Sequence, residues 1–345
     1  MRYIGAVGKD DRSLPRRRGP KRRRRRRFSK RSLSLLGVVV ALLVGEGVVR
    51  VAGLDSWLLE PLVGVQSVQP ATHRISEDPE LVYELRPDLI CGCPPCSGPR
   101  DCRPSFRTNA LGFRDRPRSL AKPSGGVRII CLGGSNTLGS QVGDQETWPA
   151  RLQAELRAQT GRDVEVWNAG CNAYMNRQKV AVGHRLLDEA EPDLFLFQLF
   201  NTGRRLRLEG VDMENQTAAS PGILRENLYW APGEDDGMAW RIWRSSALLR
   251  GSWIAVNLGM GRLTPSWFTA ELTLRAEHAN ARALETFVEA VGDRAGLAFL
   301  VPPMAEGTEP IEGKDWPRIE LRADEQPFGD EGLHEHPPPE VYRWY

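Results

Sequence analysis

The chain has 345 residues, of which 41% are hydrophobic and 26% charged, which is ordinary globular composition and not that of a disordered or fibrous chain. This length leaves room for a substantial core in one large domain or two ordinary ones. The net charge of +3 conceals an asymmetry, because residues 15–31 form an almost unbroken basic block and the remainder is mildly acidic. Such a block is typical of a nucleic-acid contact or of a solvated tail.

Residues 33–53 follow the basic block and are almost wholly apolar apart from Glu46 and Arg50. As a helix these 21 residues would span about 31 Å, which is bilayer thickness. Because arginines stay on the cytoplasmic side, we predict a basic cytoplasmic tail over residues 1–32 and a transmembrane signal anchor over residues 33–53, with the rest outside. Glu46 and Arg50 are four apart and could pair near the outer interface, although a glutamate in a span also admits a shorter or tilted helix.

The export route has alternatives. An uncleaved anchor is favoured over a cleaved signal peptide, since no small-x-small site follows the apolar segment. Residues 25–30 also resemble a twin-arginine export signal, a match that so arginine-rich a run could produce by chance. Either route places the remaining chain outside the cytoplasm, so we expect no nucleic-acid partner.

Residues 54–120 are rich in proline and cysteine and form a lead-in region of irregular or β-rich structure. It packs four cysteines into twelve residues, namely Cys91, Cys93, Cys96 and Cys102. In an oxidising compartment these cysteines predict two local disulfides with three possible pairings. A zinc site is the less favoured alternative, because a usual zinc module keeps its two pairs farther apart. Cys131 and Cys171 lie in apolar strand contexts and are expected in the core.

From residue 127 onward, strand and helix patterns alternate, which predicts an α/β fold with a mostly parallel sheet covered on both faces. The predicted strands are residues 127–132, 164–168, 193–200 and 297–301, and the predicted helices are residues 147–159, 175–190, 267–291 and 340–345. Residues 202–262 interrupt this alternation and predict an insertion over the ligand-binding end of the sheet. We therefore expect one domain over residues 121–345.

The first of these strands ends abruptly in Gly133, Gly134 and Ser135, with a further glycine at position 139. A buried parallel strand delivers the residue that follows it to the rim of the sheet, where ligands bind. Ser135 is therefore a candidate nucleophile, and a plain turn is the alternative. The segment has no Gly-Lys-Ser/Thr and lacks the dinucleotide glycine spacing, which excludes both phosphate-binding motifs.

A nucleophilic serine needs a base, a group that orients the base, and donors for the oxyanion. His334 lies three residues after Glu331 in a polar loop, so that the carboxylate could fix the tautomer of the imidazole. The alternatives are a plain charged turn and His336 as the base. Of the other histidines, His73 belongs to the lead-in, while His184 and His278 lie in helical patterns near charged residues and are expected at the surface.

The chain resembles the SGNH (GDSL-like) hydrolase family in four sequence blocks, which occur in the same order as in the family. They are residues 133–139, 166–170, 193–201 and 331–334. The chain is also similar to the membrane-anchored bacterial branch, in which a segment like residues 106–114 precedes the serine strand. The resemblance covers roughly residues 104–345. No single block is specific, whereas four in order at sensible spacing are.

The resemblance implies a three-layer α/β/α domain, flavodoxin-like in outline, and an active site without metal or organic cofactor. Ser135 would be the nucleophile and His334 the general base, oriented by Glu331. The oxyanion hole would consist of the backbone N–H groups of Ser135 and Ala173 and the side chain of Asn201.

Three positions depart from the family pattern. Glu331 stands where an aspartate is common, Ala173 stands where a glycine is frequent, and the third block keeps only Asn201. A longer carboxylate can still orient a histidine, and an alanine can still offer its backbone N–H. These departures leave open a degenerate domain that binds a glycan or a partner without turnover.

The implied function is an outward-facing serine esterase that hydrolyses O-acyl or O-acetyl esters, with its domain on the periplasmic or extracytoplasmic side of a bacterial inner membrane. The substrate class is an ester, including an acylated envelope glycan or lipid. Transfer of the acyl group to a sugar hydroxyl is the near alternative. Tryptophans and arginines of the predicted insertion could stack on a sugar or bind an anion. The alternative is that the tryptophans pack in the ordinary way and the arginines are solvated. These residues are Trp230, Trp240, Trp243, Arg204, Arg205 and Arg207.

Overall fold

The computed structural model describes residues 30–54, 57, 72–78, 80–81, 83–91, 106–139, 142–172, 174–199, 238–260, 281–301 and 314–320. The chain divides into two compact units, Met1–Gly45 and Glu46–Tyr345. The boundary between them falls inside the first helix.

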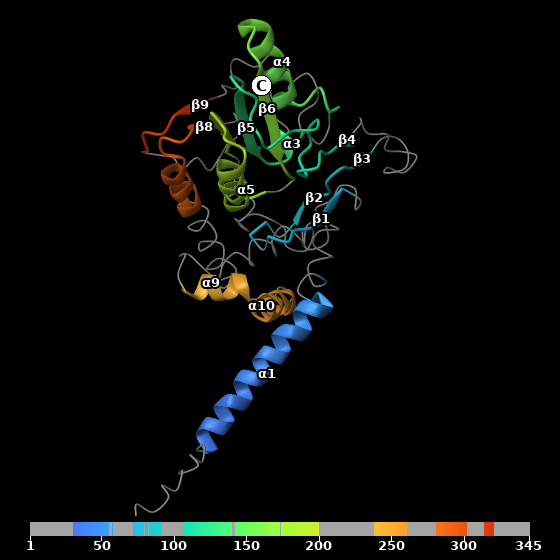
Figure 1. Ribbon diagram of the computed structural model, residues 1–345, viewed down its shortest axis with the longest axis vertical. Coiled ribbons are helices and arrows are strands. Elements are labelled where there is room, and N and C mark those ends of the chain that lie inside the picture. The colour runs from blue at the N-terminus through green and yellow to red at the C-terminus, as the bar shows by residue number, and fades with distance from the viewer. Residues whose placement is uncertain are drawn as a thin grey trace, which may run out of the picture. The chain divides into compact units, whose positions relative to one another are not determined.

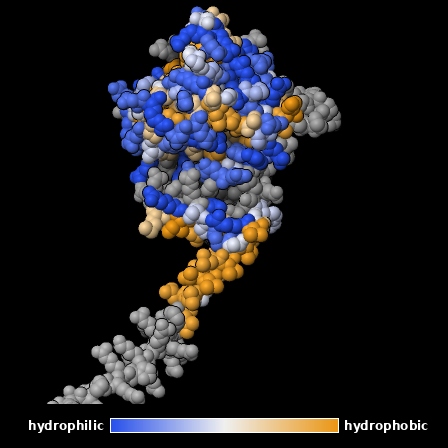
Figure 2. Space-filling view, in the orientation of Figure 1, coloured by the Kyte–Doolittle hydropathy of each residue, from blue (hydrophilic) through white to orange (hydrophobic). Residues whose placement is uncertain are grey.

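That helix, α1 (Lys30–Ala52), includes a 20-residue stretch, Leu33–Ala52, that is long and apolar enough to cross a membrane. Its large hydrophobic side chains are exposed from Leu33 to Val48, and Figure 2 shows them as a continuous hydrophobic surface. A helix suits this segment because it satisfies its backbone hydrogen bonds internally. Arg50 pairs with Glu46 one turn earlier, which confirms the predicted ion pair.

A five-stranded parallel sheet is the centre of the second unit (Figure 1). Its strands, in spatial order, are β6 (Val164–Gly170), β5 (Val127–Gly133), β7 (Leu194–Gln198), β8 (Gly296–Val301) and β9 (Arg318–Glu320). All four pairings are parallel, as the alternation of strand and helix patterns in the sequence predicts. The α/β fold class expected from the sequence is confirmed.

The order of these strands is that of flavodoxin-like folds, in which the second strand lies on one side of the first and the third lies on the other. Here β5 is the first strand and lies between β6 and β7. Its register places Gly133 beside Gly170 and Leu132 beside Phe197, so three carboxyl ends meet at one edge. This edge is the point at which the chain reverses its direction of winding.

Side chains of the sheet alternate between two hydrophobic cores. Ile130 and Leu132 of β5 belong to the first core, together with residues of α5 (Asn176–Glu189) and of the helix at residues 281–291. Ile129 and Cys131 belong to the second core, with α4 (Trp148–Thr160). Helices therefore cover both faces, which gives three layers.

Local signals in the sequence explain where these helices begin and end. Thr147 caps α4 by accepting a hydrogen bond from the N–H of Ala150 at 3.4 Å, and Gly161 ends the helix in the left-handed conformation, with φ of 64°. At the start of α5, the side chain of Gln178 reaches back to the N–H of Met175 at 3.0 Å.

The lead-in contains two short antiparallel pairs, β1 (His73–Ile75) with β2 (Tyr83–Leu85), and β3 (Ile90–Cys91) with β4 (Phe106–Arg107). Tyr83 is fully buried in the first core and donates its hydroxyl to the carbonyl oxygen of Asn172 at 2.6 Å. The lead-in and the sheet thus share one hydrophobic core.

Arg128 also ties the lead-in to the sheet. Its side chain is fully buried within β5, pairs with Glu165 at 3.0 Å, and lies 4.5 Å from the ring of Trp167. The remaining guanidinium donors bond to backbone carbonyl oxygens of Ser119, Leu120, Ala121 and Ala190. Every side of the buried charge therefore meets an acceptor or an aromatic face, which is what makes its burial tolerable.

Two further helices, α9 (Met238–Ser245) and α10 (Ala247–Met260), lie in the region that we interpreted as an insertion. The sequence interpretation assigned no helix there, because the Trp-rich and polar residues of the wider segment obscured the apolar run of α10. Cys131 and Cys171 are free and buried, as their apolar contexts predict, and burial raises the pKa of the Cys131 thiol well above its usual range.

Candidate active site

Ser135 begins a four-residue helix, α3 (Ser135–Leu138), in the turn that leaves β5. The turn closes with Gly139 in the left-handed conformation, with φ of 77°, where its N–H donates to the carbonyl oxygen of Ser135 at 2.8 Å. Open α/β sheets bind ligands beyond the carboxyl ends of their strands, at the point where the winding reverses. Ser135 occupies that point.

Two glycines let this turn pack closely against the sheet. A β-carbon on Gly133 would lie 2.5 Å from Cβ of Thr137, and one on Gly170 would lie 2.8 Å from the carbonyl carbon of the same threonine. By contrast, a β-carbon on Gly134 would meet no atom of the described residues within 4 Å. The turn is therefore tightly packed on the side of the sheet and open beside Gly134.

A hydrogen bond joins the Ser135 turn to the end of the neighbouring strand. Thr137 Oγ1, which is fully buried, donates to Oε1 of Gln198 at 2.5 Å. Within the described residues, Nε2 of Gln198 and Oδ1 of Asn136 are buried without a hydrogen-bond partner. Buried polar atoms are usually paired, so this donor and this acceptor mark a place where a ligand could bind.

Lys179 on α5 lies on the other side of Gln198. Its ammonium group is buried and donates to the carbonyl oxygen of Gln198 at 3.0 Å and to Oδ1 of Asn176 at 3.3 Å. It also lies 5.5 Å from the centre of the Phe197 ring. Lys179, Gln198 and Thr137 thus form a buried polar chain that leads to the nucleophile's turn.

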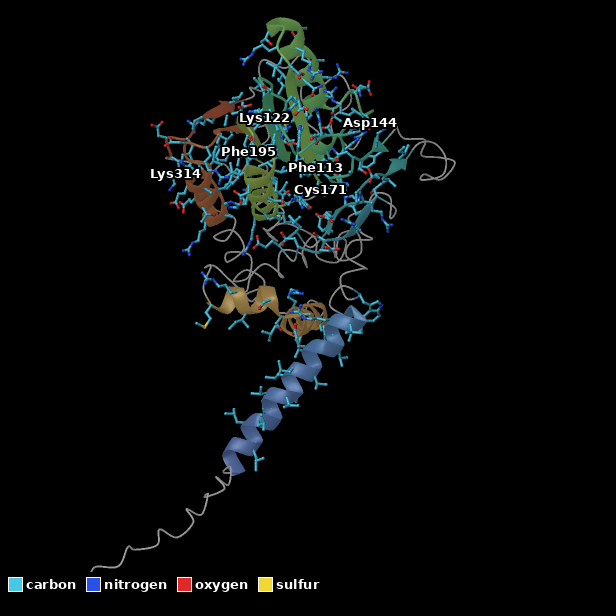
Figure 3. All side chains as sticks on the ribbon, in the orientation of Figure 1. Phe113, Lys122, Asp144, Cys171, Phe195 and Lys314 are labelled. Atoms are coloured by element: carbon cyan, nitrogen blue, oxygen red, sulfur yellow. The ribbon has the colours of Figure 1, made fainter. Side chains whose placement is uncertain are left out.

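Arg114 holds the far end of the same turn. Its buried guanidinium donates to the carbonyl oxygens of Leu138, Gly139 and Val142, at 3.1 Å for Leu138 and 2.6 Å for Val142. It also pairs with Asp144 at 3.2 Å, which is labelled in Figure 3. One cation therefore satisfies the carbonyl groups that a four-residue helix leaves exposed at its end.

Asn168, the asparagine of the second sequence block, shapes the end of β6. Its Oδ1 accepts a hydrogen bond from the N–H of Gly170 at 3.1 Å, and its own N–H donates to Asp115 at 3.2 Å. Burial raises the pKa of the Asp115 carboxyl, against the opposing effect of Arg118, which is 2.9 Å away. Asn168 thereby positions Gly170, on which the Ser135 turn packs.

Most of the other predicted site residues lie outside the described residues. They are Ala173, Asn201, Glu331, His334 and its competitor His336, the cysteines Cys93, Cys96 and Cys102, and the insertion residues Trp230, Arg204, Arg205 and Arg207. Cys91, Trp240 and Trp243 are described in their backbone alone. The structure thus brings Ser135 together with Asn136, Thr137 and Gln198, while the base, its orienting group and the remaining oxyanion donors stay predictions.

Neither of the two described histidines belongs to this cluster. His73 is buried in the lead-in, where Thr72 is 2.8 Å from its Nδ1, and burial lowers its pKa to about 4. His184 is half-buried and its ring packs edge-on against Phe287 at 5.4 Å. His184 thus lies partly exposed at the surface, as expected, with its ring against Phe287. Across the described ranges, no group of three or more His, Cys, Asp or Glu side chains could hold a metal ion.

Sequence reasoning missed Arg114, Lys179 and Gln198. Two of them carried a signal: Gln198 is the polar end of an apolar strand, and Lys179 lies one turn before Gly183 and two before Leu186 on the apolar face of its helix. A polar residue at a core position is unusual and needs a partner. Arg114 carried no such signal, since basic residues are common in loops.

The sequence matches no family model and no curated protein. Among solved structures, the chain is similar to AlinE4, an SGNH-hydrolase family esterase, with 19% identity and a TM-score of 0.22 over 51% of this chain and 82% of that chain. Two variants of esterase AlinE4 give 19% and 18% identity, with the same coverage and TM-score. The fold assignment rests on the strand order and register instead.

Proposed function

We propose that the chain is a membrane-anchored serine esterase of the SGNH type, with its α/β domain outside the cytoplasm. The observation that carries this proposal is the position of Ser135. It follows the first strand of a flavodoxin-ordered parallel sheet, at the winding reversal, on a turn that Gly133 and Gly170 allow to pack against the sheet.

The proposed reaction is ester hydrolysis through an acyl-enzyme. Ser135 Oγ attacks the acyl carbon while His334 takes its proton, and the backbone N–H groups of Ser135 and Ala173 with the Asn201 amide hold the oxyanion. His334, oriented by Glu331, then gives the proton to the departing alcohol. Water attacks the acyl-enzyme next, His334 takes a proton from it, and the acid leaves as Ser135 regains its hydroxyl.

The described residues support this proposal by fixing the nucleophile. Catalysis requires reacting groups held in place before the substrate arrives. Thr137 and Gln198 join the turn to β7, and Arg114 binds the carbonyl oxygens at its other end. Among the described residues, none occupies the space beside Gly134, which fits the approach of a substrate there.

The proposed location follows from α1. The Leu33–Ala52 stretch has the length and composition of a span, and the basic block precedes it. Arginines retained in the cytoplasm would place everything after α1 outside, in the periplasm or its equivalent. There an ester of an envelope glycan or lipid is the substrate class that we propose.

A paired labelling and activity experiment tests the enzyme. The full chain in detergent or nanodiscs is incubated with a short-chain aryl ester and, separately, with a fluorophosphonate probe. We expect the probe to label Ser135 and Ser135→Ala to lose hydrolysis, while Ser124→Ala, in an exposed loop, keeps both. Hydrolysis by Ser135→Ala at the wild-type rate, or no label at Ser135, would refute the proposal. Faster transfer to an added sugar hydroxyl than to water would identify a transferase.

A further inference from the structure

The helices α9 and α10 combine apolar surface with positive charge. Residues 238–260 contain three arginines, at positions 241, 244 and 250, and no acidic residue. The 14 residues of α10 form a helix of about 21 Å, too short to cross a bilayer. Short basic helices with apolar side chains are typical of segments that lie in the plane of a membrane interface.

Large apolar side chains of both helices are exposed. On α9, Met238 is 78% exposed and Ile242, one turn later, is 48% exposed. On α10, Leu249 is 45% exposed. Trp57, shortly after α1, is 64% exposed, and tryptophan favours the depth of the lipid headgroups. Met238 and Ile242 are neighbours on one face of α9, and neighbouring exposed apolar side chains are typical of a surface that binds a partner or a membrane.

Glu46 joins α10 to the end of α1. Its carboxylate accepts hydrogen bonds from the N–H groups of Ala247 and Leu248, at 2.9 and 3.0 Å, and from the hydroxyl of Ser246 at 2.7 Å. Arg50 pairs with the same carboxylate and donates to the carbonyl oxygen of Ser245. Glu46 thus acts as the N-terminal cap of α10 from a different helix.

The position of Glu46 on α1 indicates how deep α10 would lie in the bilayer. It precedes Ala52, the last residue of the apolar stretch, by about 9 Å along the helix axis. Interfacial helices bury their apolar face about 5–10 Å into the boundary between headgroups and acyl chains. A glutamate at this depth is costly unless it is paired, and the start of α10 supplies its partners. The depth of Glu46 below the end of the apolar stretch therefore agrees with the depth at which interfacial helices lie.

From these contacts we propose that α9 and α10 lie in the outer interface of the bilayer, docked on α1 through Glu46. Met238, Ile242 and Leu249 enter the acyl boundary, and the exposed Arg241 faces the anionic lipid headgroups. The bilayer is the occupant that continuity with α1 and the positive charge favour. The inference rests on the proposed insertion of α1, and it adds a second attachment to the lipid surface, through a segment between β7 and β8.

Spin labels test this arrangement in the full chain reconstituted in vesicles of phosphatidylethanolamine and phosphatidylglycerol. Single cysteines are introduced as Ile242→Cys and Leu249→Cys, with Arg241→Cys as the matched control on an exposed polar position and Val39→Cys as the report on α1. The unmodified chain gives the labelling background of the native cysteines. Collision with oxygen, which partitions into lipid, is compared with collision with a water-soluble nickel chelate.

We expect the ratio of oxygen to nickel collisions to exceed one at positions 39, 242 and 249 and to fall below one at position 241. A second variant, Glu46→Leu, keeps α1 apolar but removes the cap, so the ratio should drop below one at position 242 and stay unchanged at position 39.

A nickel-accessible label at positions 242 and 249 beside a lipid-exposed position 39 would overturn the interfacial docking alone. A label that meets neither reagent would also overturn it, because protein would then cover that face. If position 39 is itself in water, the anchor proposal fails together with this one. Ester hydrolysis by the same samples reports separately on Ser135.

Discussion

Arg114 Nη1 donates a hydrogen bond of 3.1 Å to the carbonyl oxygen of Leu138, the last residue of the short helix that Ser135 begins. A residue of the lead-in thereby fixes the helix that carries the candidate nucleophile. Removal of this buried charge is costly, since the carbonyl oxygens of Leu138 and Val142 would lose the donor that Arg114 supplies.

We therefore expect Arg114→Met to destabilise the protein by at least about 1–3 kcal/mol, the usual cost of leaving a buried acceptor without its donor. The thermal unfolding midpoint in nanodiscs measures this effect. Arg162→Met, at an exposed position between α4 and β6, is the control and should change the midpoint little. An equal shift in both variants would show that Arg114 has no special structural role.

The two adjacent glycines before Ser135 should respond differently to the same change. Gly133→Ala brings a methyl group against the buried Thr137, and overpacking of this kind costs about 1–3 kcal/mol and displaces the turn. Gly134→Ala adds the same methyl group to open space and should fold normally. Unfolding midpoints and fluorophosphonate labelling of each variant check the contrast, which would be wrong if Gly134→Ala were the less stable of the two.

A double-mutant cycle measures the bond between Thr137 and Gln198. Gln198→Met leaves the fully buried Thr137 hydroxyl without its acceptor and should cost about 1–3 kcal/mol. Replacing both partners, as Thr137→Val with Gln198→Met, removes the unpaired group, so the double variant should be more stable than the sum of the single losses predicts. Additive losses would show that the two side chains do not interact.

His73 should make stability depend on pH. Burial lowers its pKa from 6.5 to about 4 in the folded protein, so the unfolded chain binds more protons between these two values. Stability therefore falls as the pH decreases from 6.5 to 4, by about 3 kcal/mol in total. His73→Asn can still accept from Thr72 and does not titrate. The difference between the unfolding midpoints at pH 7 and pH 4.5 should therefore be smaller in His73→Asn than in the wild type. An equal difference in the two proteins would contradict the prediction.

The family-derived role of Asn201 can be separated from that of Ser135. Loss of one oxyanion donor lowers turnover by about 100- to 1,000-fold while leaving the nucleophile in place. We expect Asn201→Ala to lose kcat on this scale with little change in stability, and Asn215→Ala, elsewhere in the predicted insertion, to keep its kcat. An unchanged kcat in Asn201→Ala would remove this residue from the proposed mechanism.

The sequence predicts four of the five strands of the sheet well because each of the four is rich in apolar residues. The first strand is predicted to end at residue 132 and ends at Gly133, and the predicted helix at residues 147–159 is observed as Trp148–Thr160. The strand Arg318–Glu320 escaped prediction, since three residues at the sheet edge have no periodicity to detect.

In the candidate site, too, the features that depend on local sequence are predictable and the long-range contacts are not. Ser135 is predictable because a strand and its turn are adjacent in the sequence. The support from Arg114 and Gln198 is not, because those contacts join residues 24 and 61 positions apart and depend on the order of the strands. Glu46 belongs to the same class, as its partners on α10 are about 200 residues away.

The strand order also has a consequence for how the protein is made. Strand β5 is flanked by β6 and β7, and the Ser135 turn needs Gln198 of β7 before its hydrogen bond to Thr137 can form. All pairings in this sheet are between strands that are distant along the chain, and such non-local pairings form late. A nascent chain emerging from its N-terminus would therefore carry an unassembled nucleophile until β7 has followed.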